Sequence, residues 1–419
     1  MFCTCGQKVT VRLVLAVAVA RGWRIQQIDV NNAFLHGALE EELYLKPPPG
    51  YSATSDQVCR LKKSLYGLKQ APRVWYKTLA NKVLQFGFEK SPHDHCLFFK
   101  YIGAEILVLT VYVDDILLTG SSPKLMDEVK LYLHQAFTIK DFGEANYFLG
   151  LEIKLLPDVM ILTQRQYIFD ILDDMNMLET KSTATPLPTG LKLSAKDGEP
   201  LADASRYRRL IGRLLYLNFS RPDVTFATQQ LSQFTSEPTI THWRAATHLL
   251  RYLKGTMNHS LAFDSTSSLQ LEAYCDADWG TCPDSRKSIT DYCVFLGSNL
   301  ISLKAKKQST VSISSTEAEY RSMSTTTSEL LWISYLLNSL KVTVSQPIPL
   351  HCDNLSALHI ARNPVFHERT KHIEIACHFV THHVLTGFIS LVHSNVQKFA
   401  LQAVHDHAWF EKRVSRIEE

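Results

Sequence analysis

The chain of 419 residues is 45% hydrophobic and 20% charged, which is typical of globular protein and excludes a disordered chain. A formal net charge of +3 is compatible with a nucleic-acid partner but lacks the large basic excess of a protein held to nucleic acid by charge alone. Nine cysteines without a C-x-x-C pair argue against a disulfide scaffold and favour a reducing compartment.

The first apolar segment, Leu13–Ala20, follows Lys8 and Arg12 in the manner of a secretory signal peptide. The segment is short, and Trp23 leads directly into a strand-like stretch, so we expect a buried helix. We expect an intracellular chain, cytoplasmic or nuclear, that is not secreted. No segment has the ~20 uninterrupted apolar residues that a membrane span requires.

The first half of the chain has clear apolar periodicity. It predicts strands at Arg24–Val30, Ile106–Val113, Ile116–Thr119 and Tyr147–Leu155, and helices at Arg73–Phe86 and Leu125–Phe137. The second and third of these strands are separated by too few residues for anything except a tight turn. They therefore predict a hairpin.

Two adjacent carboxylates, Asp114 and Asp115, interrupt this apolar hairpin. Burial disfavours the charged form of each, and each raises the cost of ionising the other. At the turn both side chains can project from the sheet edge, where a divalent cation would hold them ionised. The alternative is a polar turn without chemistry. A third acid, Asp29, ends a separate strand and favours the cation site.

The second half opens with a segment rich in Pro, Gly, Ser and Thr, Lys181–Ala204, which predicts a linker. A mostly helical, arginine-containing stretch, Ser205–Lys254, follows. Beyond it the pattern predicts two strands, Leu269–Cys275 and Tyr292–Leu296. A long helix, Thr316–Leu337, and a last strand that ends at Asp353 follow.

Several sequence blocks of the first half, in order, resemble the reverse transcriptases of copia-type LTR retrotransposons. They are QIDVNNAFLHGALEEELYLKPPPGY (27–51), VCRLKKSLYGLKQAPRVWY (58–76), LTVYVDDILLTG (109–120) and KDFGEANYFLGLEI (140–153). The resemblance runs from about residue 9 to about residue 397. It implies an α+β fold, with a polymerase palm made of an antiparallel sheet with helices and a thumb or connection, followed by an RNase H-like α/β domain.

The resemblance implies that Asp29, Asp114 and Asp115 are the palm triad. They would hold Mg²⁺ (or Mn²⁺) with help from the Val30 carbonyl, for a two-metal addition of dNTPs to a primer 3′-hydroxyl. Phe34 falls at the family's bulky aromatic residue beneath the incoming sugar, with plain core packing as an equal alternative.

Further residues fall in the family's template and nucleotide segments. They are Tyr66, Gly67, Lys69 and Tyr112. Gly67 would permit close backbone approach, and Lys69 could meet a phosphate. The implied partners are an RNA template, a DNA primer, an RNA–DNA hybrid and dNTPs, with integrase and protease as possible neighbours in a Pol polyprotein.

The later blocks resemble the RNase H domain of the same elements. They are AYCDADWGTCPDSRKSITDYCVFLG (273–297), QSTVSISSTEAEYRSMS (308–324), LHCDNLSAL (350–358) and NPVFHERTKHIEI (363–375). By motif, Asp276, Glu317 and Asp353 are the implied metal-binding acids. Ser314-x-x-Glu317 also fits a helix capping box, and Glu319 is then expected to be structural.

The chain departs from the family pattern in two places. Ala400 stands where the family has a fourth carboxylate, which predicts a weaker second RNase H metal. The chain begins just before the helix that leads to Asp29, without the family's preceding basic fingers segment. The alternative hypothesis is therefore a truncated or decayed, non-catalytic remnant that binds nucleic acid.

We expect four regions: a reverse transcriptase at 1–181, a linker with a helical thumb or connection at 182–264, an RNase H-like domain at 265–400 and a tail at 401–419. A zinc site is a further hypothesis from the clustered residues His367, His372, Cys377, His378, His382 and His383. Their spacing fits no C-x-x-C or H-E-x-x-H pattern, so we do not predict zinc there.

Overall fold

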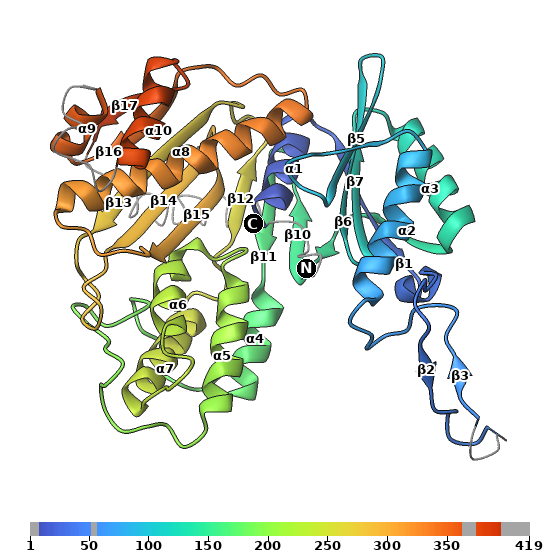
Figure 1. Ribbon diagram of the computed structural model, residues 1–419, viewed down its shortest axis with the longest axis horizontal. Coiled ribbons are helices and arrows are strands. Elements are labelled where there is room, and N and C mark those ends of the chain that lie inside the picture. The colour runs from blue at the N-terminus through green and yellow to red at the C-terminus, as the bar shows by residue number, and fades with distance from the viewer. Residues whose placement is uncertain (1–7, 52–56, 363–373, 395–419) are drawn as a thin grey trace. The chain divides into compact units, whose positions relative to one another are not determined.

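The computed structural model describes residues 8–51, 57–362 and 374–394. By its internal contacts the chain divides into two compact units, Met1–Leu149 with Ser339–Lys341 and Gly150–Asn338 with Val342–Glu419. Both units combine sheets with helices (Figure 1), so the predicted α+β class is confirmed. The predicted boundaries at 181 and 264 separate regions of different expected function, not of different internal contacts, and they stay predictions.

The first unit is built on a six-stranded sheet in which every neighbouring pair is antiparallel. In spatial order its strands are β4 (Glu89–Lys90), β5 (Leu97–Ile102), β6 (Glu105–Tyr112), β7 (Asp115–Gly120), β1 (Arg24–Val30) and β8 (Ile139–Glu144). The predicted hairpin is β6–β7, which closes where Tyr112 pairs with Asp115. This sheet carries Asp29, Asp114 and Asp115, which are called the first acid group below.

Two helices, α2 (Ala71–Gln85) and α3 (Pro123–Phe137), pack on this sheet (Figure 1). Trp75 of α2 and Met126 of α3 join one buried apolar cluster with strand residues such as Leu109. The helices match the predicted positions, and α3 begins at a proline, which is favourable in the first turn.

The first apolar segment is helix α1 (Lys8–Ala20), and most of its side chains are buried. The prediction of a buried helix is therefore confirmed. Among the described residues, no helix has both the length and the apolar character needed to cross a lipid bilayer. The remaining elements of this unit are short: η1 (Ala33–His36), β2 (Tyr44–Leu45), β3 (Cys59–Arg60) and β9 (Tyr147–Phe148).

The predicted strand Tyr147–Leu155 is interrupted. Leu149 and Gly150 have φ angles of 51° and 67°, in the left-handed region that breaks an extended chain. Strand β10 (Leu151–Leu155) begins after this break and pairs with β11 (Val159–Thr163), which in turn pairs with β12 (Leu261–Asp264). Strands β11 and β12 pair although they lie far apart in the chain, and such a pairing leaves little trace in the local sequence.

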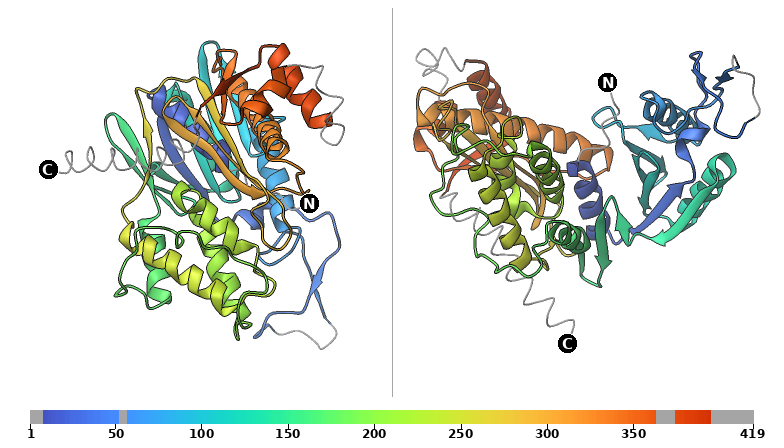
Figure 2. Two further views of the ribbon diagram at one scale, coloured as in Figure 1. Left: turned by 90° about the vertical axis from the view of Figure 1, so that its left-hand side faces the viewer. Right: turned by 90° about the horizontal axis from the view of Figure 1, so that it is seen from below.

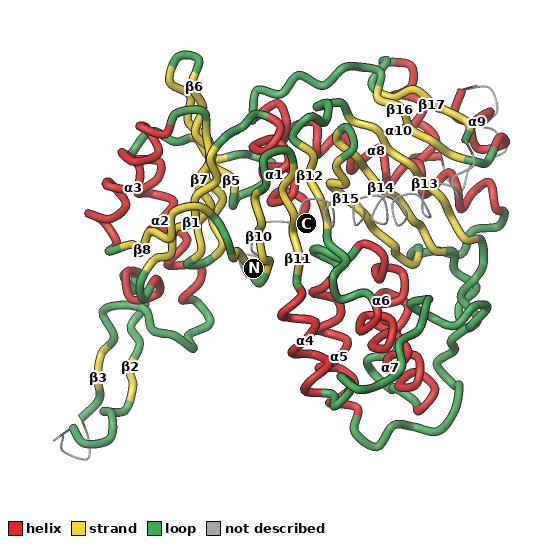
Figure 3. The backbone as a smooth tube through the Cα atoms, turned by 180° about the vertical axis from the view of Figure 1, so that it is seen from behind, coloured by secondary structure: helices red, strands yellow, loops and turns green. Residues whose placement is uncertain are grey.

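The predicted arginine-containing stretch is helical, and Figure 3 shows its helices gathered with α4. The helices are α4 (Arg165–Asp174), α5 (Ala204–Leu217), η2 (Pro222–Val224), α6 (Thr225–Ser232) and α7 (Ile240–Gly255). Their apolar faces meet in one cluster that includes Ile171, Leu214 and Leu249.

The last sheet has five strands, in the order β15 (Asn299–Lys307), β14 (Ile289–Leu296), β13 (Leu271–Asp278), β16 (Ile348–Cys352) and β17 (Ile389–His393). The first three are antiparallel, whereas β16 runs parallel to both β13 and β17. Helix α8 (Ser315–Ser339) lies along this sheet (Figure 2), where Ser322 Oγ donates to the Asp291 carbonyl at 3.3 Å. Helices α9 (Leu355–Arg362) and α10 (Glu374–Leu385) complete the mixed α/β arrangement.

Candidate functional site

The first acid group forms where β1 meets the β6–β7 hairpin. Asp29 and Asp115 stand opposite each other in the antiparallel β1–β7 pair. The Val30 N–H donates to the Asp114 carbonyl at 3.0 Å. Strand pairing thus brings together three acids that lie up to 86 positions apart in the sequence. All three side chains are half-buried at this edge.

The turn that carries Asp114 is held in an unusual conformation. Val113 has a φ of 58°, which is strained for a β-branched residue. The buried indole N–H of Trp75 donates to the Val113 carbonyl at 2.5 Å. Helix α2 therefore holds the turn through this hydrogen bond. The sequence analysis did not foresee that Trp75 supports the turn that carries Asp114.

The acids of this group repel one another. Burial, followed by the charges of Asp114 and Asp29, raises the pKa of Asp115 to about 6, against a hydrogen bond from Gln27 that lowers it. Burial and then Asp114 also raise the pKa of Asp29, while Lys140 on β8 opposes this shift. A site that disfavours its own negative charge in this way suits a bound cation.

This group is looser than a closed metal site. Its three carboxylates do not all lie within 4.8 Å of one another, whereas the ligand atoms of the second group described below do. Their oxygen atoms are the ligand type that Mg²⁺ prefers. The donor set therefore fits magnesium in its chemistry, and an ion would have to draw the carboxylates together.

Two predicted nucleotide-binding residues lie beside these acids. The rings of Phe34 and Tyr66 are in contact, with centroids 4.7 Å apart. Partial burial and then the charges of Asp114 and Asp29 raise the pKa of the Tyr66 hydroxyl, so this ring lies within electrostatic reach of the acids. Tyr66 is 57% exposed. The pair is therefore available to a ligand at the same edge.

The other predicted binding residues are also placed. Gly67 has a φ of 93° and open space where a side chain would project, which suits the close approach that we predicted. Lys69 is exposed and Tyr112 is half-buried at the end of β6. The Val30 side chain is buried.

The second acid group forms between the five-stranded sheet and helix α8, and it contains Glu319 where the sequence motif predicted Glu317. Glu319 Oε1 accepts from the Ala277 N–H at 3.1 Å, beside Asp276. A ligand atom of Glu319 lies within 4.8 Å of those of Cys352 and Asp353. Burial and then Cys352, Asp276 and Asp353 raise the pKa of Glu319 to about 10. Asp276 and Asp353 therefore meet Glu319 and not Glu317.

Glu317 points elsewhere. Its Oε1 accepts from Arg321 Nη2 at 2.8 Å, and its Oε2 accepts from the Ile313 N–H at 2.8 Å. Its own N–H donates to Ser314 Oγ at 3.2 Å, which is one half of the predicted capping box, whereas the carboxylate returns to the Ile313 N–H and not to that of Ser314. The structure thus engages Glu317 at the start of α8 and brings Glu319 to Asp276 and Asp353 in its place, while the metal-binding role of either acid stays a prediction.

Two further acids of this sheet were missed. Asp278 lies two residues after Asp276 on β13, and Asp291 lies opposite Asp276 on β14. Burial and then the charges of Asp278 and Asp276 raise the pKa of Asp291 to about 7. The D-A-D spacing of 276–278 could have signalled the first of these, because alternate residues share a face.

Asp276 lies inside β13 and not at the end of a strand as predicted, since β13 continues to Asp278. Asp353 directly follows β16, as predicted. Ala400 and two residues of the zinc hypothesis, His367 and His372, lie outside the described residues. Within the part of the chain that the structure describes, Glu319, Cys352 and Asp353 are the one group of three whose ligand atoms all lie within 4.8 Å of one another.

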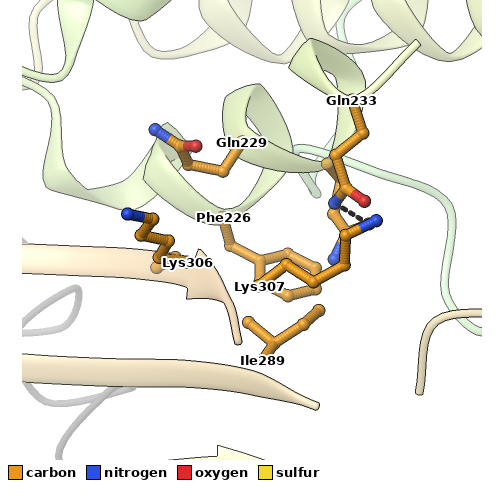
Figure 4. Close-up of a pocket in the computed structure, with 8 residues that line it drawn as sticks. Phe226, Gln229, Gln233, Ile289, Lys306 and Lys307 are labelled. Atoms are coloured by element: carbon orange, nitrogen blue, oxygen red, sulfur yellow. Dashed lines mark hydrogen bonds between the residues drawn. The ribbon is translucent and has the colours of Figure 1, made fainter. Parts of the chain in front are cut away.

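A shallow pocket lies between α6 and the strands of the same sheet (Figure 4). Phe226, which is 44% exposed, and Gln229 line it from α6, and Ile289, Lys306 and Lys307 line it from the sheet. An exposed ring can stack on a base, and lysines can contact phosphates. The pocket is therefore a candidate contact for nucleic acid.

Comparisons with known proteins agree with the resemblance to retrotransposon reverse transcriptases. Residues 2–189 match the family model described as "Reverse transcriptase (RNA-dependent DNA polymerase)". The chain is 46% identical over 386 residues to a retrovirus-related Pol polyprotein from transposon RE1 of Arabidopsis thaliana, covering 92% of this chain and 26% of the relative. It is 35% identical over 383 residues to the Pol polyprotein from transposon TNT 1-94 of Nicotiana tabacum, covering 88% of this chain and 29% of the relative.

A shorter relative is matched over its whole length. The chain is 34% identical over 308 residues to a putative transposon Ty5-1 protein of Saccharomyces cerevisiae, covering 72% of this chain and 100% of the relative. The chain spans about a quarter of the length of the plant Pol polyproteins, 26% and 29%.

Proposed function

Because the chain belongs to the copia-type retrotransposon Pol family and carries its reverse transcriptase region, we propose that it is an RNA-directed DNA polymerase. It adds dNTPs to the 3′-hydroxyl of a DNA primer paired to an RNA template. A second activity, the cleavage of RNA in RNA–DNA hybrids, belongs to the five-stranded sheet.

The observation that carries the first proposal is the pairing of β1 with β7, which places Asp29 opposite Asp115 at the turn that bears Asp114. These carboxylates hold Mg²⁺ or Mn²⁺, with the Val30 carbonyl as a further oxygen ligand. When bound, two such ions lower the pKa of the primer hydroxyl and balance the charge on the leaving pyrophosphate.

Phe34 and Tyr66 act on the incoming nucleotide. The Phe34 ring contacts Tyr66, with centroids 4.7 Å apart, and Tyr66 lies within reach of the acids; Phe34 would fill the space of a 2′-hydroxyl, which favours deoxynucleotides. Lys69 and Lys140 are cations on the same unit that can meet phosphates. Gly67 allows the template backbone to approach closely.

The second activity is supported by the meeting of Glu319 on α8 with Asp276 on β13 and Asp353 at the end of β16. Buried, mutually repelling carboxyl groups are stable at pH 7 only if they stay protonated or a cation neutralises them. Asp276, Glu319 and Asp353 would hold a divalent cation such as Mg²⁺, which would supply an activated water for attack on an RNA phosphodiester. The pocket of Figure 4 supplies a stacking ring and lysines for the hybrid.

A second candidate function is a nucleic-acid-binding protein without turnover. The loose spacing of Asp29, Asp114 and Asp115 favours it, since their carboxylates do not all gather within 4.8 Å. The two candidates differ in one measurable property: the first extends a primer, and the second only binds it.

Primer extension on an RNA template with Mg²⁺ and dNTPs tests the proposal. We expect extension by the full chain and a loss of at least about a hundredfold for Asp114→Asn, since a ligand and a charge are removed from the site. Glu128→Gln, an exposed acid on α3, is the matched control and retains extension. Binding of the primer–template without extension would support the second candidate.

Cleavage of a labelled RNA–DNA hybrid tests the second activity. Glu319→Gln should lose cleavage, whereas Glu317→Gln should retain most of it, because Glu317 is engaged with Arg321 and the Ile313 N–H. The reverse result would restore the assignment that the sequence motif predicted.

A further inference from the structure

The second acid group contains a thiol. The ligand atoms of Glu319, Cys352 and Asp353 all lie within 4.8 Å of one another. Magnesium is held by oxygen, whereas thiolates select softer ions such as Zn²⁺ and Cd²⁺. We propose that Cys352 and Cys275, with Glu319 and Asp353, form a binding site for one thiophilic divalent cation.

The second thiol comes from the neighbouring strand. Strands β13 and β16 are parallel, with Tyr274 paired to His351, so Cys275 and Cys352 are the next residues in register. The two thiol groups share a hydrogen bond, and Cys275 Sγ also lies 3.4 Å from the His351 carbonyl. Two thiols and two carboxylates make a four-ligand set of the kind that suits tetrahedral zinc.

The distances allow closure around an ion. Bond lengths of about 2.3 Å to sulfur and about 2.0 Å to oxygen place tetrahedral ligand atoms about 3.5 Å apart. Glu319, Cys352 and Asp353 already lie within 4.8 Å of one another, which leaves about 1 Å of adjustment for these three side chains, whereas Cys275 lies outside that limit and has to move further toward the ion. Binding replaces the protons of the thiols and of the Glu319 carboxyl, which pass to solvent, by the charge of the cation.

Three of the four ligands are shielded from water, and the fourth is accessible to an ion from solvent. Cys275 and Cys352 are 0% exposed, and Glu319 is 5% exposed. Asp353 is exposed at the end of β16 and offers the first ligand to an ion from solvent. Cys352 Sγ is 3.8 Å from Glu319 Oε2, so an ion that Asp353 captures meets both groups next.

The site overlaps the acids proposed for hybrid cleavage. A thiophilic ion on Glu319 and Asp353 displaces Mg²⁺ from them and inhibits the nuclease. This consequence, unlike the binding itself, rests on the function proposed above.

Titration of the reduced, metal-free full chain with Cd²⁺ tests the binding, since each thiolate–Cd²⁺ bond adds a near-ultraviolet charge-transfer band. We expect one saturable equivalent, lost in Cys352→Ser and weakened at least about tenfold in Cys275→Ser. Cys293→Ser, which removes a buried thiol on β14, is the matched control and keeps the band. Near-ultraviolet circular dichroism verifies that each variant is folded.

A full band in Cys352→Ser assigns the signal to other thiols, such as Cys3 and Cys5, and overturns the proposal. A full band in Cys275→Ser overturns the two-thiol set, and the absence of a saturable band in the wild-type chain overturns the site. Inhibition of hybrid cleavage by Zn²⁺, relative to each variant's own Mg²⁺-supported rate, should weaken in Cys352→Ser. If Mg²⁺ supports no cleavage at all, the nuclease proposal fails, and the Cd²⁺ titration still decides the metal site.

Discussion

A single indole nitrogen joins the core of the first unit to the turn that bears Asp114. Trp75→Phe keeps an aromatic ring in the buried position but removes the donor to the Val113 carbonyl. We expect a loss of about 1–3 kcal/mol in the free energy of unfolding. Because Val113 is strained at φ 58°, the freed turn relaxes, and extension falls by about tenfold or more.

Urea unfolding and primer extension measure these two effects. Tyr76→Phe, on the same helix, is the matched control, since it removes a hydroxyl that donates to the His95 carbonyl and not to the turn. Unfolding at lower urea with unchanged extension would show that the bond stabilises the unit without positioning Asp114.

Glu319 also predicts a pH dependence of stability. Its pKa in the folded chain is raised to about 10 from an ordinary value of 4.5. The folded state therefore keeps a proton that the unfolded state loses above pH 4.5, so stability is greatest below that pH and declines up to pH 10. The decline is at most about 1.4 kcal/mol per pH unit.

In metal-free buffer, Glu319→Gln keeps a neutral group at all pH values. We expect the difference in urea midpoint between this variant and the wild-type chain to widen steadily from pH 5 to pH 9, in favour of the variant. Parallel pH profiles for the two proteins would contradict the burial of a protonated Glu319.

At the scale of elements, the start of α7 carries the opposite pH dependence. Thr239 and His242 form a capping box in which His242 Nδ1 accepts from the Thr239 N–H at 3.0 Å. His242 Nε2 lies 3.0 Å from the Ser194 carbonyl, so the neutral ring donates there. Protonation of Nδ1 would destroy the acceptor of the box.

Burial lowers the pKa of His242, although the Ser194 carbonyl and nearby acids oppose the shift. The stability that this histidine contributes is therefore present above about pH 6.5 and is lost as the pH falls. We expect the wild-type chain to lose stability between pH 7 and pH 5 relative to His242→Gln, which can cap without titrating. Thermal unfolding across this range measures it, and equal losses in both proteins would exclude His242 as the cause.

Elements with strong local patterns were predictable from the sequence. The β6–β7 hairpin and helix α3 lie where alternation and helical spacing place them, because both depend on neighbours in the chain. The break at Leu149–Gly150 is a matter of two left-handed φ angles, and β13 continues to Asp278 because it pairs with β14; the apolar pattern of each strand alone encodes neither.

The roles of Glu317 and Glu319 show the same limit. Both lie in the first turns of α8, and a capping pattern cannot say which one faces the sheet. The signal lay further along the helix, in buried residues that recur in phase with Glu319: Met323, Thr326, Leu330, Ile333 and Leu337. Both acids are buried, so helical phase over five turns is a better guide to which of them faces the sheet than a motif of four residues.

At the scale of the whole molecule, sequence resemblance predicted two centres, and the structure places one acid group in each compact unit. It did not predict that contacts would divide the chain after Leu149. The reason is that β10 and β11, which lie inside the matched reverse transcriptase region, belong to a sheet that β11 extends by pairing with β12, beyond the helical region. The order of the motifs reflects the two proposed activities, whereas the boundary between the compact units depends on which strands pair.

Two centres on separate units predict that each can fail alone. Asp114→Asn should abolish extension but retain hybrid cleavage, and Glu319→Gln should do the reverse. A mixture of the two variants on a long RNA template should then yield DNA freed of its template, because the hybrid released by one chain is a substrate for the other. Gel analysis of labelled RNA and DNA strands measures both products, with the double variant as the inactive control. Extension by the mixture without removal of RNA would show that both acid groups must act from the same chain.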